Sequence, residues 1–233
     1  MKIIVTRPER DAAPLAEKLT RRGHETIILP LMKIVPDMDY EIPRRSYQAI
    51  CLTSANGVRM LRDISDLRDV PVFAVGQQSR DAADKAGFTN TMAQGGDVAG
   101  LTKYLAQNLK RNDGPLLYIS GAETSGDLEG HLKRNGFDVD RVVTYAAIPE
   151  IMAGKADIIK SADAVVLYSP RSAKLWSLAI EFLQLETHAK RLDHICLSAN
   201  VAAALPQIWH KSVASEPTEN ALLAQLDYGS KAD

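Results

Sequence analysis

The chain repeats its own order of structural elements. Residues Ile3–Pro36 align without a gap on Leu116–Pro149. Each segment reads as an apolar strand, a loop, an amphipathic helix closed by a glycine (Gly23 or Gly136), a second strand and a proline. Two shorter echoes are Leu52–Arg59 with Leu167–Lys174 and Phe73–Ala83 with Ile195–Leu205. The repeat indicates two copies of one α/β unit, and two similar lobes create a cleft in which function should be sought.

Short apolar runs predict the strands of these units. They are residues 3–5, 26–29, 49–52, 72–75, 116–119, 142–146, 164–168 and 194–197. Such apolar runs are typical of strands covered on both faces, as in parallel sheets. Amphipathic patterns predict helices over residues 11–22, 79–86, 97–109, 125–135, 171–183 and 218–226. The predicted fold is therefore α/β, with two similar doubly wound parallel-sheet (flavodoxin-like) lobes.

Two proline-marked stretches, 30–43 and 145–152, occupy equivalent places in the repeat and suggest where the lobes begin and end. If both are crossovers, one lobe is continuous over residues 37–147. The other is discontinuous and is assembled from residues 1–35 plus 150–233. The connection between them is then a two-stranded hinge near residues 31–40 and 145–152.

Composition excludes several kinds of partner. The chain has 233 residues, of which 45% are hydrophobic and 24% charged, and its formal net charge is −1. No global positive field recruits nucleic acid or an acidic membrane, so any anion site must be local. Cys51 and Cys196 lie inside apolar runs, which predicts buried reduced thiols and a cytoplasmic protein. The start MKIIVTRP does not read as a signal peptide, and no apolar run approaches the ~18 residues that span a bilayer.

The loops that follow the strands form the candidate site, because ligands of doubly wound sheets bind outside the carboxyl ends of the strands. These loops are Thr6–Glu9, Thr53–Gly57, Gly76–Ser79, Gly121–Gly126, Ser169–Ser172 and Ser198–Asn200. Each precedes a predicted helix, whose unpaired N–H groups and dipole favour anions. For any single loop, ordinary helix capping is the alternative interpretation. Six such loops favour a ligand with several carboxylates or phosphates.

Other site chemistries lack their motifs. The chain has no phosphate-binding P-loop and no G-x-G-x-x-G, its histidines lack metal-ligand spacing, and no nucleophile elbow surrounds Ser54. Arg7 and Arg171 could each contact an anion or remain solvated at the surface. Tyr145 ends an apolar run at the predicted crossover, where its phenol could donate a proton into the cleft or pack at the hinge.

Five segments in series resemble the uroporphyrinogen-III synthase family. They are IIVTRPE from Ile3, ICLTSANGV from Ile50, FAVGQQSRDAADKAGF from Phe73, FDVDRVVTYAAIP from Phe137 and VVLYSPRSA from Val165. Their order and spacing match the family over nearly the whole chain. The discontinuous two-lobe arrangement is also what that family looks like.

The resemblance implies a small-molecule substrate, hydroxymethylbilane, a linear tetrapyrrole with eight carboxylates. The implied reaction loses water, inverts ring D and closes the ring to uroporphyrinogen III. It needs no metal, nucleotide or organic cofactor, and we expect a monomer with no nucleic-acid or membrane partner. Tyr145 matches the family tyrosine suspected of acting as the general acid. The expected substrate-binding residues are Thr6, Arg7, Ser54, Asn56, Gly76, Ser79, Gly121, Ser169, Ser198 and Asn200.

Two departures from the family pattern leave a second function open. Residues 198–202 read SANVA, where the family often has a G-P-T-T-A-like turn, and Ser120 precedes Gly121 where many bacterial members have an arginine. The alternative function is a non-catalytic, two-lobed protein that binds a tetrapyrrole or another polyanion. A nucleotide-dependent α/β enzyme is a third interpretation, which lacks any phosphate motif.

Overall fold

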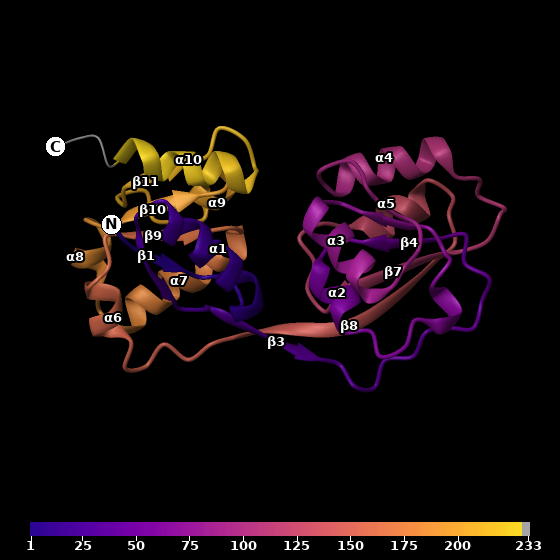
Figure 1. Ribbon diagram of the computed structural model, residues 1–233, viewed down its shortest axis with the longest axis horizontal. Coiled ribbons are helices and arrows are strands. Elements are labelled where there is room, and N and C mark those ends of the chain that lie inside the picture. Colours follow the sequence, from indigo (N-terminus) through magenta and orange to yellow (C-terminus); the bar gives the residue numbers. More distant parts are fainter. Residues whose placement is uncertain (230–233) are drawn as a thin grey trace. The chain divides into compact units, whose positions relative to one another are not determined.

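A computed structural model describes residues 1–229 of the chain (Figure 1). The described chain divides into two units. Unit 1 contains residues 1–33 and the described residues from 148 onward, and unit 2 contains residues 34–147. Each unit contains its own core, so the two are described separately below.

Unit 1 is built on a parallel five-stranded sheet in the order β11-β10-β9-β1-β2 (Figure 1). Its strands are β1 (Lys2–Val5), β2 (Glu25–Ile28), β9 (Ala164–Leu167), β10 (Asp193–Cys196) and β11 (Lys211–Val213). Its helices are α1 (Glu9–Arg21), α6 (Ala156–Lys160), α7 (Pro170–Phe182), α8 (Glu186–Ala189), α9 (Ala199–Ala203) and α10 (Glu219–Gly229). Successive strand residues point to opposite faces. Ile3 therefore packs with side chains of α1 and α10, and Ile4 packs with side chains of α7 and α9.

Unit 2 contains a six-stranded sheet in the order β3-β8-β7-β4-β5-β6, parallel from β8 to β6. Its strands are β3 (Met32–Pro36), β4 (Ala49–Leu52), β5 (Val72–Ala74), β6 (Thr91–Ala93), β7 (Leu116–Gly121) and β8 (Val139–Pro149). Its helices are α2 (Ala55–Arg59), α3 (Gln77–Ala86), α4 (Val98–Asn108) and α5 (Leu128–Arg134), with a 3-10 turn at Ser65–Leu67. Ile50 packs towards α2 and α3, and Cys51 packs towards α4 and α5. The predicted doubly wound parallel fold is confirmed in both units.

The repeat is visible in the order of the strands. Under the sequence alignment, β7, β8, β4 and β5 of unit 2 correspond to β1, β2, β9 and β10 of unit 1, and β6 takes the place of β11. Both sheets then have the same spatial order. Numbered along the chain, unit 1 has the flavodoxin order 2-1-3-4-5, whereas unit 2 reads 3-2-1-4-5. The numbering differs because the chain leaves unit 1 after its second strand. The equivalent glycines Gly23 and Gly136 both have φ of 85°, which confirms the predicted left-handed helix stop.

The chain passes between the units along two hydrogen-bonded strands, β3 and β8. The Asp37 N–H donates to the Thr144 carbonyl, and the Glu150 N–H donates to the Leu31 carbonyl, both at 2.9 Å. The first proline-marked stretch thus contains a strand that the apolar pattern did not predict. Two predictions stay open here. One is that this pair of strands bends as a hinge, and the other is that the chain forms one lobe from residues 1–35 plus 150–233 and another from residues 37–147.

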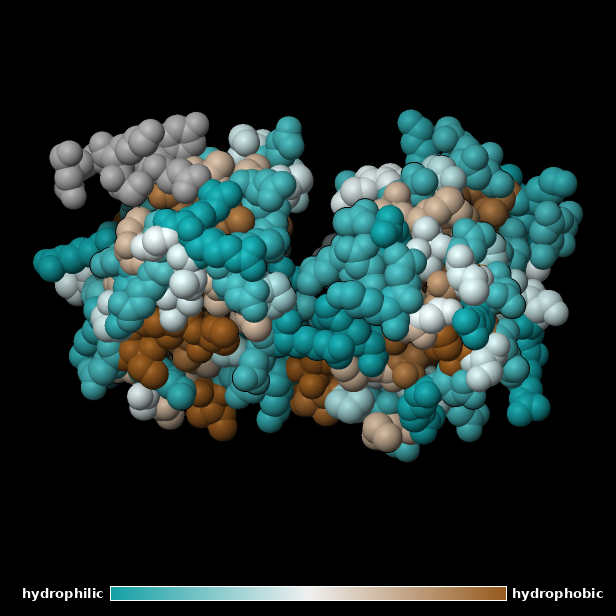
Figure 2. Space-filling model, viewed as in Figure 1, coloured by the Kyte–Doolittle hydropathy of each residue, from teal (hydrophilic) through white to brown (hydrophobic). Residues whose placement is uncertain are grey.

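The surface of the molecule mixes polar and apolar side chains, with hydrophilic groups over most of the visible face (Figure 2). None of the helices within residues 1–229 combines the length and the hydropathy needed to cross a membrane.

Candidate functional site

The structure gathers the predicted site residues into two sets, one at the carboxyl edge of each sheet. In unit 1, the neighbouring strands β10, β9 and β1 are followed by the loops that carry Ser198, Ser169 and Thr6. In unit 2, the neighbouring strands β5, β4 and β7 lead into Gly76, Ser54 and Gly121. That the two sets serve one ligand stays a prediction.

In unit 1, some polar side chains of the set already make hydrogen bonds within the protein, and others do not. Thr6 is buried, and its hydroxyl donates to the Val166 carbonyl at 2.7 Å, which ties β1 to β9. Ser169 caps α7 in a reciprocal capping box with Ser172. Ser198 is the N-cap of α9, but its hydroxyl makes no capping bond, and Asn200 is exposed in the same helix. The α9 loop therefore offers more unused polar groups than the loops after β1 and β9.

Arg7 lies in a charged cluster within unit 1. Its guanidinium is 3.7 Å from the Asp11 carboxylate and 3.4 Å from that of Glu219, and it lies 4.6 Å from the centroid of the Tyr168 ring. The Tyr168 phenol donates to Glu219 at 3.3 Å. Burial, reinforced by the Glu219 charge, raises the pKa of Tyr168 well above its usual range. The charge of Arg7 is thus balanced by carboxylates of the chain itself.

In unit 2, the loops after β4 and β5 present short side chains and backbone. The Ser54 hydroxyl accepts from the Asn56 N–H at 3.2 Å, and the Asn56 carbonyl oxygen Oδ1 accepts from Arg59 at 3.0 Å. Gly76 is the N-cap of α3, without a side chain to satisfy the first N–H groups, and the space beside its Cα is open. Ser79 is buried in the first turn of that helix.

Tyr145 is seated on Gly121. The two residues are paired between β8 and β7 at an irregularity in the register. A Cβ placed on Gly121 would lie 2.6 Å from Cζ of Tyr145 and 2.9 Å from its phenol oxygen. The ring therefore rests against the Gly121 backbone, and the side chain is only 8% exposed. Gly121, expected as a substrate contact, has a packing role that no other residue type can fill.

Two residues beside Tyr145 were not predicted. Tyr118 is buried, and its hydroxyl lies 3.1 Å from that of Thr53. Burial raises the pKa of Tyr118, and the hydrogen bond with Thr53 and then the positive charge of Arg141 lower it in part. Arg141 donates to the Ser120 hydroxyl at 2.9 Å. Arg141 lies one residue before the predicted strand 142–146, and the register shift beside Gly121 breaks the simple alternation of faces, so the sequence held no clear signal for it.

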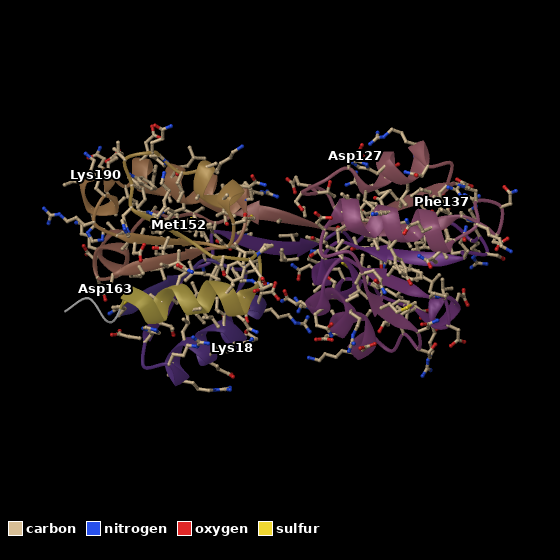
Figure 3. All side chains as sticks on the ribbon, turned by 90° about the horizontal axis from the view of Figure 1, so that it is seen from above. Lys18, Asp127, Phe137, Met152, Asp163 and Lys190 are labelled. Atoms are coloured by element: carbon tan, nitrogen blue, oxygen red, sulfur yellow. The ribbon has the colours of Figure 1, made fainter. Side chains whose placement is uncertain are left out.

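A pocket of about 380 Å³ opens between the strand ends and the helices α4 and α5 of unit 2. It is lined by Thr53, Val75, Gly96, Asp97, Val98, Ala99, Ser125, Gly126, Asp127 and His131. Asp97 and Asp127 cap the two helices by accepting from the N–H groups of Gly100 at 2.7 Å and Gly130 at 2.8 Å. The Gly130 bond holds the pKa of Asp127 below its usual value. An anion in this pocket would be repelled by two carboxylates, whereas the N-terminus of α3 at Gly76 has no acidic residue in its first turn. Asp127 is labelled in Figure 3.

Comparison with known proteins identifies the family. The model of the family described as "Uroporphyrinogen-III synthase HemD" matches residues 13–224. The chain belongs to the uroporphyrinogen-III synthase family.

Within residues 1–229, no three His, Cys, Asp or Glu side chains gather closely enough to hold a metal ion.

Two named relatives of this family match parts of the chain. The porphyrin biosynthesis protein HemD of Ruminiclostridium josui is 29% identical over 168 residues, covering 62% of this chain and 31% of that protein. The uroporphyrinogen-III synthase of Chlorobaculum parvum is 27% identical over 97 residues, covering 37% of this chain and 39% of that protein. The chain thus spans only about a third of the length of these curated relatives.

Solved structures share the fold over the full chain. Uroporphyrinogen-III synthetase from Helicobacter pylori superimposes with a TM-score of 0.67 at 16% identity, covering 99% of both chains. A mutant uroporphyrinogen III synthase from Thermus thermophilus gives 0.55 at 17% identity, covering 100% of this chain and 98% of that one. At such identities these likenesses show the fold alone.

Proposed function

We propose that the chain is a cyclising lyase, which converts hydroxymethylbilane into uroporphyrinogen III with loss of water and inversion of ring D. Family membership supports the reaction. The structural observation that supports the proposal is the position of Tyr145, whose ring and phenol oxygen pack against Gly121 at the carboxyl edge of the unit 2 sheet.

In the proposed reaction Tyr145 acts as the general acid. Its phenol protonates the terminal hydroxyl of the substrate, the carbon–oxygen bond breaks, and water leaves. The substituted carbon of ring D then attacks the terminal carbon that has lost its hydroxyl, which gives a spiro intermediate. This intermediate reopens and closes with ring D inverted. General acid catalysis contributes about 10²–10⁴-fold in typical enzymes. Most of the remaining task is orientation, which supplies roughly 7–11 kcal/mol in favourable cases.

The eight substrate carboxylates need donors along the two sheet edges. The bare N-terminus of α3 at Gly76 and the uncapped hydroxyl of Ser198 support this role, since neither is satisfied by a side chain of its own helix. The acidic pocket beside α4 and α5 does not favour it. On this proposal the remaining predicted contacts, including Ser54 and Ser169, act mainly by fixing the helices that present these donors.

We further propose that the protein acts as a monomer in the cytoplasm, with the tetrapyrrole as its small-molecule ligand and no cofactor, nucleic acid or membrane. The thiols support the reducing compartment. Burial raises the pKa of Cys51 to about 12 and that of Cys196 to about 11, so both stay protonated at neutral pH. Both cysteines are free.

Product analysis tests the function. Hydroxymethylbilane is supplied, the reaction is quenched early and oxidised, and the I and III isomers of uroporphyrin are resolved by chromatography. We expect predominantly isomer III. Tyr145→Phe should slow turnover by about 10²–10⁴-fold without lowering the melting temperature. The control is Tyr104→Phe on α4, which keeps the ring contact with Phe73 and should leave turnover unchanged. Only isomer I from folded protein would favour the non-catalytic binding function instead.

A further inference from the structure

Arg141 extends along the end of β7. Its backbone is paired with Tyr118, but its guanidinium reaches towards the carboxyl end of that strand. Nε donates to the Ser120 hydroxyl at 2.9 Å, and Nη2 donates to the carbonyls of Gly121 at 2.9 Å and Ala122 at 3.0 Å. Three bonds to one short segment fix the position of a long side chain that would otherwise sample many rotamers.

The same segment positions Tyr145. The Ala122 N–H donates to the Tyr145 carbonyl at 2.8 Å, and Gly121 carries the Tyr145 ring. Arg141 and Tyr145 both belong to β8, and both therefore contact the segment Gly121–Ala122. The guanidinium carbon also lies 6.0 Å from the centroid of the Tyr118 ring. These contacts place a cation at the edge where the phenol of Tyr145 is seated.

Among residues 1–229, no carboxylate balances the positive charge of Arg141. Its acceptors are one hydroxyl and two carbonyls, and Nη1 donates no hydrogen bond to any residue in the range 1–229. Arg7 and Arg45, by contrast, each pair with two acidic side chains. Arg141 is also exposed. A guanidinium that is fixed, accessible and electrostatically uncompensated is suited to receive a carboxylate from a ligand.

We propose that Arg141 is a substrate-binding residue, which holds one carboxylate of the polycarboxylate ligand next to Tyr145. The inference rests on the function proposed above and assigns part of its recognition to a residue that was not among the predicted substrate contacts. A carboxylate held there would fix the ligand with respect to the Tyr145 phenol.

Arg111 offers a matched control in the same unit. Its Nε donates to the Asn135 carbonyl at 3.1 Å, and its guanidinium lies 5.4 Å from the Phe137 ring centroid. It thus repeats the contacts of Arg141 with a carbonyl and an aromatic ring, but at the amino end of β8. Asp127 and Phe137, which flank the two ends of α5, are labelled in Figure 3 and mark these opposite edges.

The test compares Arg141→Gln, Arg141→Lys and Arg111→Gln with the unaltered protein. Uroporphyrin I, an octacarboxylate that the enzyme cannot cyclise, is the binding probe, and its Kd is measured by fluorescence quenching at increasing salt. We expect Arg141→Gln to weaken binding by about tenfold, a typical size for one lost charge-assisted hydrogen-bonding group. Its salt dependence should also become shallower. Arg141→Lys should recover part of the affinity, and Arg111→Gln should bind like the unaltered protein.

Kinetics with hydroxymethylbilane provide the second measurement. Loss of a carboxylate contact should raise KM more than it lowers kcat, whereas loss of a merely structural contact leaves KM and the salt dependence unchanged. If Arg141→Gln lowers the melting temperature, Arg141→Lys and Ser120→Ala replace it in the test. Lysine keeps the charge without the planar guanidinium, and Ser120→Ala removes only the acceptor of Nε. Both variants should therefore lower the affinity for uroporphyrin I by less than tenfold.

The outcomes separate this inference from the proposed function. Normal turnover, with equal probe affinity for Arg141→Gln and the unaltered protein, would overturn the role of Arg141 and leave the function standing. Probe binding that depends on Arg141, without turnover, would support the role of Arg141 and remove the function. An unaltered protein that neither turns over nor binds the probe would overturn both.

Discussion

Gly121 and Tyr145 show at the scale of single residues how surroundings decide what a side chain does. The tyrosine was predicted from its match to the family, and the glycine from its place in a polar loop. The structure joins them in one contact, which gives the glycine its role. Arg141 and Glu219 were not predicted, because their importance depends on partners brought near by folding. Glu219 is separated from Arg7 by 212 positions in the sequence.

Gly121→Ala should displace the Tyr145 ring. The new methyl group would lie 2.6 Å from Cζ, closer than real contacts allow, so the ring must move or the strand must shift. We expect turnover to fall at least about tenfold and the free energy of unfolding to fall by about 1–3 kcal/mol. In a double-mutant cycle, Gly121→Ala should cost much less turnover when Tyr145 is already phenylalanine. Fully additive losses would show that the two residues act independently.

His194 should make stability depend on pH. The residue is fully buried, stacks 4.8 Å from Trp209, and donates from Nδ1 to the His210 carbonyl at 2.9 Å. Burial lowers the pKa of His194 to about 4. The unfolded chain then binds more protons between pH ~6.5 and that value, so stability is full above the unfolded pKa and declines as pH falls through this window. The decline should be on the order of 3 kcal/mol.

Urea unfolding between pH 7 and 4 measures this effect. Because carboxylates also titrate in part of the window, the comparison is with His194→Gln, which cannot gain the proton. The variant should be less stable at pH 7 but show a shallower pH dependence. An equal slope in both proteins would show that the decline has another origin.

At the scale of elements, the sequence predicts what is buried better than what lies at an edge. All eight predicted strands occur, and each coincides with buried positions or, for β2, pairs directly with β1. The strands β3, β6 and β11 were missed. Each lies at the edge of its sheet, is three to five residues long and has partly exposed side chains, so it lacks the apolar run that marks a central strand. The short helices α6 and α8 were missed, and α2 and α9 were expected after their loops but given no range, since about one turn is too short to show periodicity.

Two serines at helix N-termini of unit 1, Ser169 and Ser198, should differ in their effect on stability. Ser169 accepts from Ser172 N–H in the capping box of α7, whereas Ser198 makes no capping bond to α9. Ser169→Ala should therefore lower the free energy of unfolding by about 1 kcal/mol. Ser198→Ala should change it by less than about 0.5 kcal/mol. Urea denaturation of both variants checks the difference, and equal losses would contradict the assignment of the caps.

At the scale of the whole molecule, unit 2 should fold without unit 1. Residues 34–147 are continuous in the chain, and both faces of their sheet are covered by their own helices. A fragment of these residues should show a single cooperative thermal transition by circular dichroism. The paired fragments 1–33 and 148–233 should not fold when they are separate. A fragment 34–147 that binds hydrophobic dyes and melts without cooperativity would show that the unit depends on the rest of the chain.

The placement of β1 between β2 and β9 has a consequence for synthesis on the ribosome. The first two strands of unit 1 leave the exit tunnel before unit 2, but their neighbour β9 is translated only after residue 147. At roughly 5–20 residues per second, β1 and β2 wait for several to about twenty seconds while unit 2 is made. During that interval, the apolar side chains of Ile3, Ile4 and Val5 lack the strand that completes their sheet. The segment that contains β1 and β2 is therefore exposed to aggregation, or to capture by a chaperone, for as long as unit 2 takes to be synthesised.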